Sequence, residues 1–162
     1  MTTMTSGGPI GVLFVCTGNI CRSPLAEGIF LHKVNRRGVA DRFTVDSAGT
    51  GNWHAGAKPD PRMQAIADKY GVVMPSRARQ ITDSDFRRFN HLICMDEDHR
   101  RQLLDRGAPH AKLRLLLEVD DAASIDEVPD PYYGGPAGFE RVYRLVDSAC
   151  EALLETLLAD SI

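Results

Sequence analysis

Apolar residues recur along the chain with two spacings, and each spacing predicts a type of element. Residues 10–15 (IGVLFV) form a continuous apolar run, which is typical of a strand buried on both faces. Shorter apolar runs predict further strands at residues 43–45, 92–95 and 113–117. Between residues 139 and 158 the apolar positions follow a helical period instead, and they predict the clearest amphipathic helix in the sequence.

Capping and turn residues predict where the other helices begin and end. Ser23-Pro24 suits a helix start, with Ser as the N-cap and Pro at the first helical position. Gly38 suits the position just after the end of that helix. Comparable signals bound the remaining helices: Asp60-Pro61 to Gly71, a capping box from Thr82 to Asp85, and residues 97–106 followed by Gly107.

Predicted strands alternate with predicted helices, which is the pattern of parallel β-α-β crossovers. About 27 residues separate the first two strands, which is ample for a helix. The sequence therefore predicts a three-layer α/β/α fold with a central, mostly parallel four-stranded sheet. We expect residues 1–9, rich in Thr, Gly and Ser, to be a flexible tail and residues 10–162 to form a single domain.

Composition narrows the functional class. Acidic residues number 22 against 19 Lys and Arg, and the net charge of −3 weighs against nucleic-acid binding. No apolar run approaches the roughly 18 residues of a membrane span, and no basic residue precedes the first apolar run, so we expect neither a membrane segment nor a signal peptide. Four cysteines are too few for a disulfide scaffold, which favours a cytoplasmic protein.

The segment after the first predicted strand concentrates the candidate chemistry. Cys16 directly follows the strand, and Arg22 stands six positions later at the predicted helix start. Backbone N–H groups and the helix dipole favour an anion there, and they stabilise a thiolate for the same reason. A guanidinium can bind two phosphate oxygens at once. The pattern predicts a phosphate-binding loop, after the first strand, that carries its own nucleophile.

A second interpretation of Cys16 stays open on this evidence, because most free cysteines are buried small hydrophobes. The bare C-x5-R spacing is a weak signal. The apolar strand before it, the Gly18-Asn19 pair within it and Ser23-Pro24 after it strengthen the case for a site. A nucleotide-binding P-loop is excluded here, since the G-x4-G-K-[ST] pattern is absent.

Four separated segments together resemble the low-molecular-weight protein tyrosine phosphatases, especially the bacterial members. They are VCTGNICRSP (15–24), DSAGTGNW (46–53), SRARQI (76–81) and DPYYG (130–134). The resemblance extends from about Val12 to the final helix. It implies hydrolysis of phosphotyrosine and small aryl phosphates through a cysteinyl-phosphate intermediate, without a cofactor or metal.

The resemblance also implies roles for single residues. Cys16 corresponds to the nucleophile, Arg22 to the phosphate ligand and Asp130 to the general acid and base. The expected phosphate-binding residues are Thr17, Gly18, Asn19, Ile20, Cys21 and Arg22, and the expected support network is Asn19, Ser23 and Ser47. Many members have a His where this chain has Ser76, which leaves the hydrogen bonds of that network open.

Residue chemistry alone supports Asp130 less strongly. Acidic residues are abundant at 118–130, and Asp96, after a predicted strand, is a rival general acid. Asp130 differs because Pro131 stiffens the chain after it and Tyr132-Tyr133 could shield its carboxyl group.

Two further features of the loops carry predictions. Trp53, Tyr132 and Tyr133 are loop aromatics that could form a slot for a phenyl ring. Cys21 is a candidate redox partner that could protect Cys16 through a reversible disulfide.

Two alternatives to the phosphatase remain in view. One is an arsenate reductase on the same fold, because arsenate mimics phosphate. The other is a non-catalytic phosphotyrosine-binding module. The expected partners are phosphotyrosine-containing proteins and a cognate tyrosine kinase, with no nucleic acid and no membrane among them.

Overall fold

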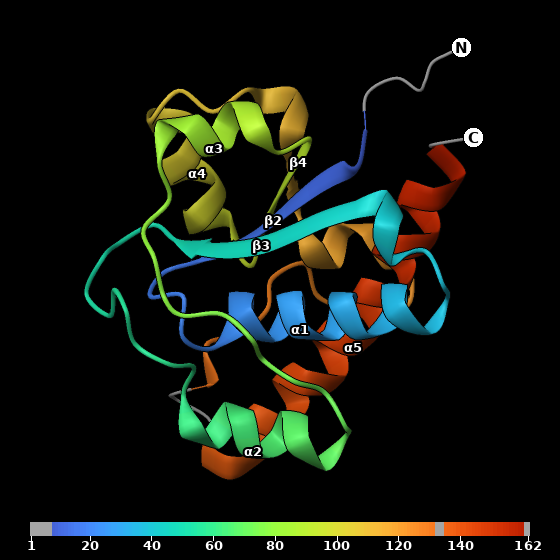
Figure 1. Cartoon of the computed structure of the whole chain (residues 1–162). Helices are drawn as coiled ribbons and strands as arrows, with labels where there is room; N and C mark the ends of the chain where they lie inside the picture. The colour runs from blue at the N-terminus through green and yellow to red at the C-terminus, as the bar shows by residue number, and fades with distance from the viewer. Residues whose placement is uncertain (1–7, 132–134, 161–162) are drawn as a thin grey trace.

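Four parallel strands form the centre of the molecule in the computed structural model, which describes residues 8–131 and 135–160 (Figure 1). The strands pair in the order β3-β2-β4-β5, and every pair is parallel. Their bounds are β2 Ile10–Cys16, β3 Phe43–Gly49, β4 His91–Cys94 and β5 Leu113–Leu115. The predicted sheet is confirmed, and it is parallel throughout.

Helices cover both faces of this sheet, as the α/β/α prediction requires. Helices α1 (Arg22–Arg36) and α5 (Gly135–Asp160) pack on one face, while α3 (Asp83–Arg88) and α4 (Glu97–Asp105) lie on the other (Figure 1). Helix α2 (Pro61–Lys69) packs against α5 at the edge of the first layer.

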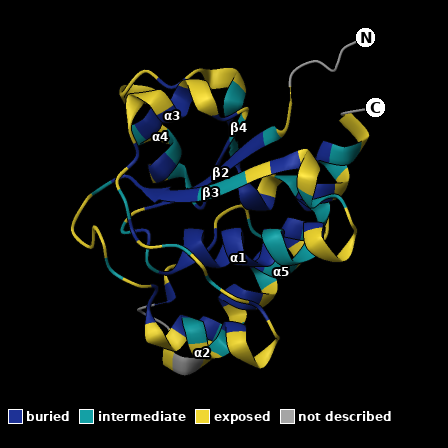
Figure 2. Cartoon of the chain, in the orientation of Figure 1, coloured by how far each residue is buried: buried dark blue, intermediate teal, exposed yellow. Residues whose placement is uncertain are grey.

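The continuous apolar run of β2 is explained by its central position. Val12 and Phe14 face the cluster beneath α1 and α5, whereas Leu13 and Val15 face the cluster beneath α3 and α4. All four side chains are fully buried, and Figure 2 shows the strand as buried along most of its length. Burial of each such side chain stabilises the fold by about 1.5–3 kcal/mol.

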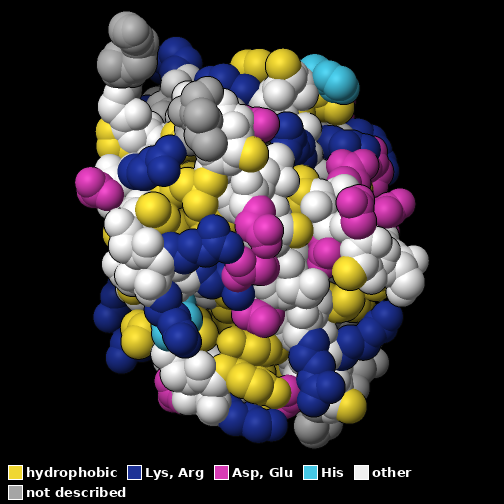
Figure 3. Space-filling model, turned by 90° about the vertical axis from the view of Figure 1, so that its right-hand side faces the viewer, with side chains coloured by type: hydrophobic (Ala, Val, Ile, Leu, Met, Phe, Trp, Pro, Cys, Tyr) yellow, Lys and Arg dark blue, Asp and Glu magenta, His cyan; other side chains and the backbone are white. Residues whose placement is uncertain are grey.

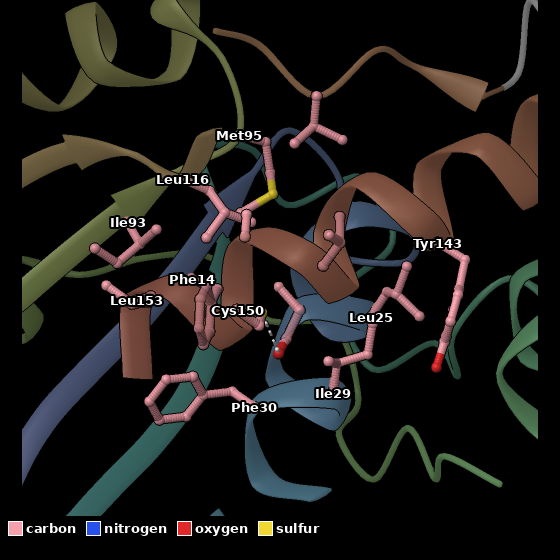
Figure 4. Close-up of a cluster of buried hydrophobic side chains, with 14 of the residues drawn as sticks. Phe14, Leu25, Ile29, Phe30, Ile93, Met95, Leu116, Tyr143, Cys150 and Leu153 are labelled. Carbon is pink, nitrogen blue, oxygen red and sulfur yellow. Dashed lines mark hydrogen bonds between the residues drawn. The ribbon is translucent and has the colours of Figure 1, made fainter. Parts of the chain in front are cut away.

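The larger apolar cluster fixes α1 against the sheet (Figure 4). Phe14 of β2 and Phe30 of α1 pack with their ring centroids 5.7 Å apart. Cys150 of α5 lies against the same helix, with its Sγ 3.7 Å from the carbonyl oxygen of Ala26. These contacts hold the middle of α1 between β2 and α5.

Several predicted boundaries are wrong by one to four residues. Helix α1 begins at Arg22 with Cys21 as its N-cap, so neither Ser23 nor Pro24 has its predicted capping position. Strand β3 extends to Gly49 rather than residue 45, because its register with β2 continues as far as Cys16. The other differences are β4 at His91–Cys94, β5 ending at Leu115 where a 3₁₀ turn (Leu116–Val119) begins, and α4 ending at Asp105.

The capping predictions for the middle of the chain are confirmed. The Asp60 side chain accepts a hydrogen bond from the backbone N–H of Arg62 at the start of α2. Thr82 and Asp85 form the predicted capping box of α3. Gly71, after α2, has a φ of +75°, which suits a glycine at a helix end.

Charged side chains of both signs are mixed on the face shown in Figure 3. Within residues 8–131 and 135–160, no helix is both long and apolar enough to cross a membrane. The predicted tail at residues 1–9 falls mostly outside the described residues, and the single-domain assignment stays a prediction.

Candidate active site

Within the described part of the chain, the loop between β2 and α1 leaves a row of backbone N–H groups without partners. Three carbonyl groups in and next to the loop accept hydrogen bonds from the neighbouring chain. The Cys16 carbonyl accepts from the Thr50 N–H at 2.9 Å, that of Thr17 from Gly51 at 3.1 Å, and that of Ile20 from Asp60 at 2.7 Å. By contrast, none of the N–H groups of residues 17–21 donates to another group in the described part of the chain. Consecutive unpaired N–H groups at a helix start form an anion site.

The backbone of this loop is tightly constrained. Asn19 has a φ of +57°, the left-handed region that a residue with a side chain rarely adopts. Gly49 at the end of β3 packs against the loop so closely that a Cβ there would lie 2.6 Å from the carbonyl oxygen of Thr17. The loop therefore depends on both its own unusual conformation and its packing against β3.

Cys16 lies at the bottom of the loop with 3% of its surface exposed. Its Sγ is 2.9 Å from the hydroxyl oxygen of Ser23, and that oxygen also accepts from Asn19 Nδ2 at 2.9 Å. A thiolate has no proton to give, so the Ser23 hydroxyl donates to the sulfur when Cys16 is ionised. Ser23 thus stabilises the charged form of the thiol instead of capping α1.

Arg22 is buried and held from the side away from the loop. Its Nη1 donates to Asp96 Oδ2 at 3.1 Å and to the carbonyl oxygen of Val128 at 3.0 Å. Among the described residues, its hydrogen bonds use Nη1 alone. Nη2 and Nε remain to donate to two oxygens of a phosphate.

The loop lines a small cavity of about 170 Å³ that also contains Asp130. Its walls are Cys16, Thr17, Gly18, Ile20, Cys21, Arg22, Trp53, His54 and Asp130. Trp53 stands at its edge with 70% of its surface exposed. Asp130, Thr17 and Arg22 also border a larger cleft of about 820 Å³, which is therefore adjacent to the small cavity.

The structure brings together most of the predicted site residues. Asn19 differs from the other loop residues, because its buried side chain points into the support network rather than the cavity. The rival acid Asp96 is the N-cap of α4 and the ion-pair partner of Arg22. Tyr132 and Tyr133 lie outside the described residues.

Comparison with known proteins identifies the family of this chain. The model of the low molecular weight phosphotyrosine protein phosphatase family matches residues 11–161. The chain belongs to that family. It is therefore an enzyme, a phosphoric monoester hydrolase of the protein-tyrosine-phosphatase class.

Individual relatives agree over most of the chain. The low molecular weight protein-tyrosine-phosphatase of Streptomyces coelicolor is 44% identical over 149 residues, covering 88% of this chain and 90% of that protein. The phosphotyrosine protein phosphatase of Sus scrofa is 40% identical over 148 residues, covering 89% and 93%. The crystal structure of YfkJ from Bacillus subtilis superposes with a TM-score of 0.92 at 36% identity, covering 97% of this chain and 99% of that chain. These relatives support neither the arsenate reductase nor the binding module.

The support network of this phosphatase reaches Ser76 through a buried carboxyl group. Asn19 Nδ2 donates to Ser47 Oγ at 3.0 Å, and Asn19 Oδ1 accepts from the backbone N–H of Arg79 at 3.0 Å. Ser47 then donates to Glu27 Oε1, and Ser76 donates to Glu27 Oε2, each at 2.6 Å. The serine in place of the usual histidine therefore stays connected to the loop.

Glu27 is the member of this network that the sequence analysis missed. It lies on α1 with 3% of its surface exposed, and burial raises the pKa of its carboxyl group, opposed by the hydrogen bonds from Ser47 and Ser76. One signal was present in the sequence. Glu27 stands one turn before Phe30 and two turns before Val34, on the apolar face of the predicted helix, where an acidic residue needs partners.

Ser76→Ala should lower the free energy of unfolding by about 1–2 kcal/mol near neutral pH, since one hydrogen bond to a buried carboxylate is lost. The loss should shrink in acid. The folded-state pKa of Glu27 is raised from 4.5, so protonation at low pH removes the charge that the hydroxyl stabilises. Urea unfolding at pH 4, below the ordinary pKa of 4.5 that Glu27 exceeds, and at pH 8 measures both effects. Equal losses at the two pH values would show that Ser76 does not support the charge on Glu27.

Cys21 is the second thiol of the cavity and is buried. Burial raises the pKa of its thiol, with the neighbouring Cys16 and Asp60 acting in the same direction. Because the thiolate is the attacking form, the raised pKa makes Cys21 a poor nucleophile. Both sulfurs are free thiols here, and the redox role of Cys21 stays a prediction.

Proposed function

We propose that Cys16 is the nucleophile, Arg22 the phosphate ligand and Asp130 the general acid and base of this phosphotyrosine phosphatase. One observation carries the proposal: the unpaired N–H groups of residues 17–21 and the unused nitrogens of Arg22 surround the sulfur of Cys16 in one cavity. Such an arrangement holds a phosphate with its phosphorus facing the sulfur.

In the first step the Cys16 thiolate attacks phosphorus opposite the tyrosyl oxygen. An S–P bond forms while the P–O bond to the phenol breaks. The loop N–H groups and Arg22 hold the three equatorial oxygens, where most of the charge of the transition state lies. Asp130 gives its proton to the departing phenolic oxygen, which leaves as a neutral phenol.

In the second step a water molecule replaces the phenol. The Asp130 carboxylate accepts a proton from the water as its oxygen attacks phosphorus and the S–P bond breaks. Inorganic phosphate leaves, and the sulfur returns to the thiolate that the Ser23 hydroxyl stabilises. Asp130 has regained its proton, so every group then has its starting protonation state.

The surroundings of the cavity support an aryl phosphate as substrate. Trp53 stands at the edge with its ring exposed, where it can pack on a phenyl group. Proteins carrying phosphotyrosine are thus the proposed physiological substrates, and the tyrosine kinase that forms them is the corresponding partner. Because Cys16 works as a free thiol, the cytoplasm, a reducing compartment, suits the enzyme.

The test is hydrolysis of a small aryl phosphate and of matched phosphotyrosine and phosphoserine peptides, with a metal chelator and a thiol reductant present. We expect turnover with the chelator, and a kcat/KM for the phosphotyrosine peptide on the order of 10² above that for phosphoserine, because the ring fills the slot and the phenol leaves more easily. Absence of turnover under these conditions would contradict the proposal. Equal rates on the two peptides would contradict the aryl slot alone.

A further inference from the structure

A buried histidine lies directly beside the phosphate loop and has no part in the steps above. His99 is on α4, and only 1% of its surface is exposed. Its Nε2 is 2.8 Å from Oγ1 of Thr17, the residue that follows the nucleophile. His99 therefore joins α4 to the loop through a polar contact, and its burial restricts the movement of its side chain.

The other side of the imidazole faces the start of its own helix. The backbone N–H of Asp96 donates to His99 Nδ1 at 3.2 Å. Asp96 Oδ1 accepts from the backbone N–H of His99 at 3.0 Å and also lies 3.1 Å from Nδ1. The Asp96 N–H is fixed by the backbone and points at Nδ1, whereas Asp96 Oδ1 already accepts from the His99 N–H. We therefore take Nδ1 as the acceptor and assign the ring proton to Nε2. Nε2 then donates to Thr17 Oγ1.

The ring is neutral in the working range of the enzyme. Burial lowers the pKa of His99 to about 4. The charged groups that face it are Asp96 and Asp98 from α4, Arg22 from α1 and Asp130 from the segment before α5. Arg22 acts in the same direction as burial, and the three carboxylates oppose it. The donor to Thr17 is therefore unchanged between pH 5 and pH 8.

The start of α4 also contacts Arg22, at the other end of the phosphate-binding segment. Asp96, which forms the reciprocal cap with His99, pairs with Arg22 through its other carboxylate oxygen. Thr17 is the first residue of the loop and Arg22 the last. A single turn of α4 thus contacts both ends of the phosphate-binding segment.

We propose that His99 is a positioning residue of this phosphatase, which fixes the phosphate loop by donating from Nε2 to Thr17 while Asp96 fixes Arg22. The inference rests on the proposed function of the loop. These two contacts fix the distance between the loop N–H groups and the Arg22 guanidinium before phosphate binds. Little reorganisation is therefore needed when the anion binds. Loosening this contact should weaken binding of phosphate and of the transition state together.

Two substitutions separate the two sides of the ring. His99→Gln can still accept from the Asp96 N–H through Oε1 and donate to Thr17 through Nε2. His99→Asn is too short to reach both and keeps only the cap. We expect His99→Asn to lower kcat/KM for an aryl phosphate about tenfold and to raise the inhibition constant of inorganic phosphate by a similar factor, the scale of one hydrogen bond. His99→Gln should stay within about threefold of wild type in both measurements. His110→Asn, at an exposed histidine, is the matched control.

Two further measurements guard against a merely structural effect. Combining His99→Asn with Thr17→Val should cost no more than the larger single change, because both remove the same hydrogen bond. Nitrogen NMR of the wild-type ring should show a protonated Nε2 and an unprotonated Nδ1 from pH 5 to pH 8. The inference is overturned if His99→Asn lowers only thermal stability, if the two substitutions are additive, or if the ring proton lies on Nδ1. Thermal shift measures phosphate binding to wild type and to the variants, and it tests the inference without any need for turnover. Failure of wild type to turn over would instead refute the proposed function.

Discussion

Serine in place of Cys16 should lower aryl phosphate turnover by a factor on the order of 10⁵, the scale seen when a covalent nucleophile is removed. Among the described residues, the hydrogen-bond partner of this side chain is the Ser23 hydroxyl, which is not a base that can accept a serine proton. The serine can therefore not form the covalent intermediate. Steady-state and single-turnover assays at equal enzyme concentration measure the loss.

The same variant should still bind phosphate. The N–H groups of residues 17–21 and the side chain of Arg22 are unchanged by the substitution. Inorganic phosphate should therefore raise the melting temperatures of Cys16→Ser and of wild type by similar amounts. Cys150→Ala is the control, because it removes a buried thiol of α5 that does not line the cavity. It should keep wild-type kcat. A Cys16→Ser enzyme with substantial turnover would exclude Cys16 as the nucleophile.

The sequence predicted the layers and the loop because both depend on local patterns. The run at residues 10–15 has the composition of a strand covered on both sides, and β2 lies in the middle of the sheet. Ser23 shows where such patterns end. Its type suits an N-cap, yet its hydroxyl faces Cys16 and accepts from Asn19, and α1 starts at Arg22 without a side-chain cap. A hydroxyl used by the active site is not available to the helix.

The missed residues act across long distances in the chain. Glu27 meets Ser76 from a loop 49 positions away, and His99 meets Thr17 across 82 positions. Asp96 was considered as a general acid from its place after a strand, but its carboxylate pairs with Arg22, 74 positions away. Each of these polar side chains satisfies a buried partner that only the folded arrangement brings near, so spacing along the sequence could not identify them.

Asn in place of Asp130 should lower kcat for phenyl phosphate by about 10²–10³, the usual contribution of a positioned general acid. An amide neither gives a proton to the phenolic oxygen nor accepts one from water, so both steps slow. Asp126→Asn is the matched control. That exposed carboxylate lines the larger cleft near Asp130 but not the small cavity, and its loss should leave kcat within about twofold of wild type, as for a surface change outside the chemistry.

The leaving group shows which step Asp130 serves. A more acidic phenol needs less help from an acid, so phosphate esters of such phenols should lose less activity in Asp130→Asn than phenyl phosphate does when the first step limits the rate. With a very acidic phenol the second step should limit instead, and a burst of phenol equal to the enzyme concentration should precede slow steady turnover. An equal loss for all esters without a burst would place the proton donor elsewhere. The assignment of Asp130 thus depends on a pattern across substrates, which a loss of folded enzyme cannot imitate.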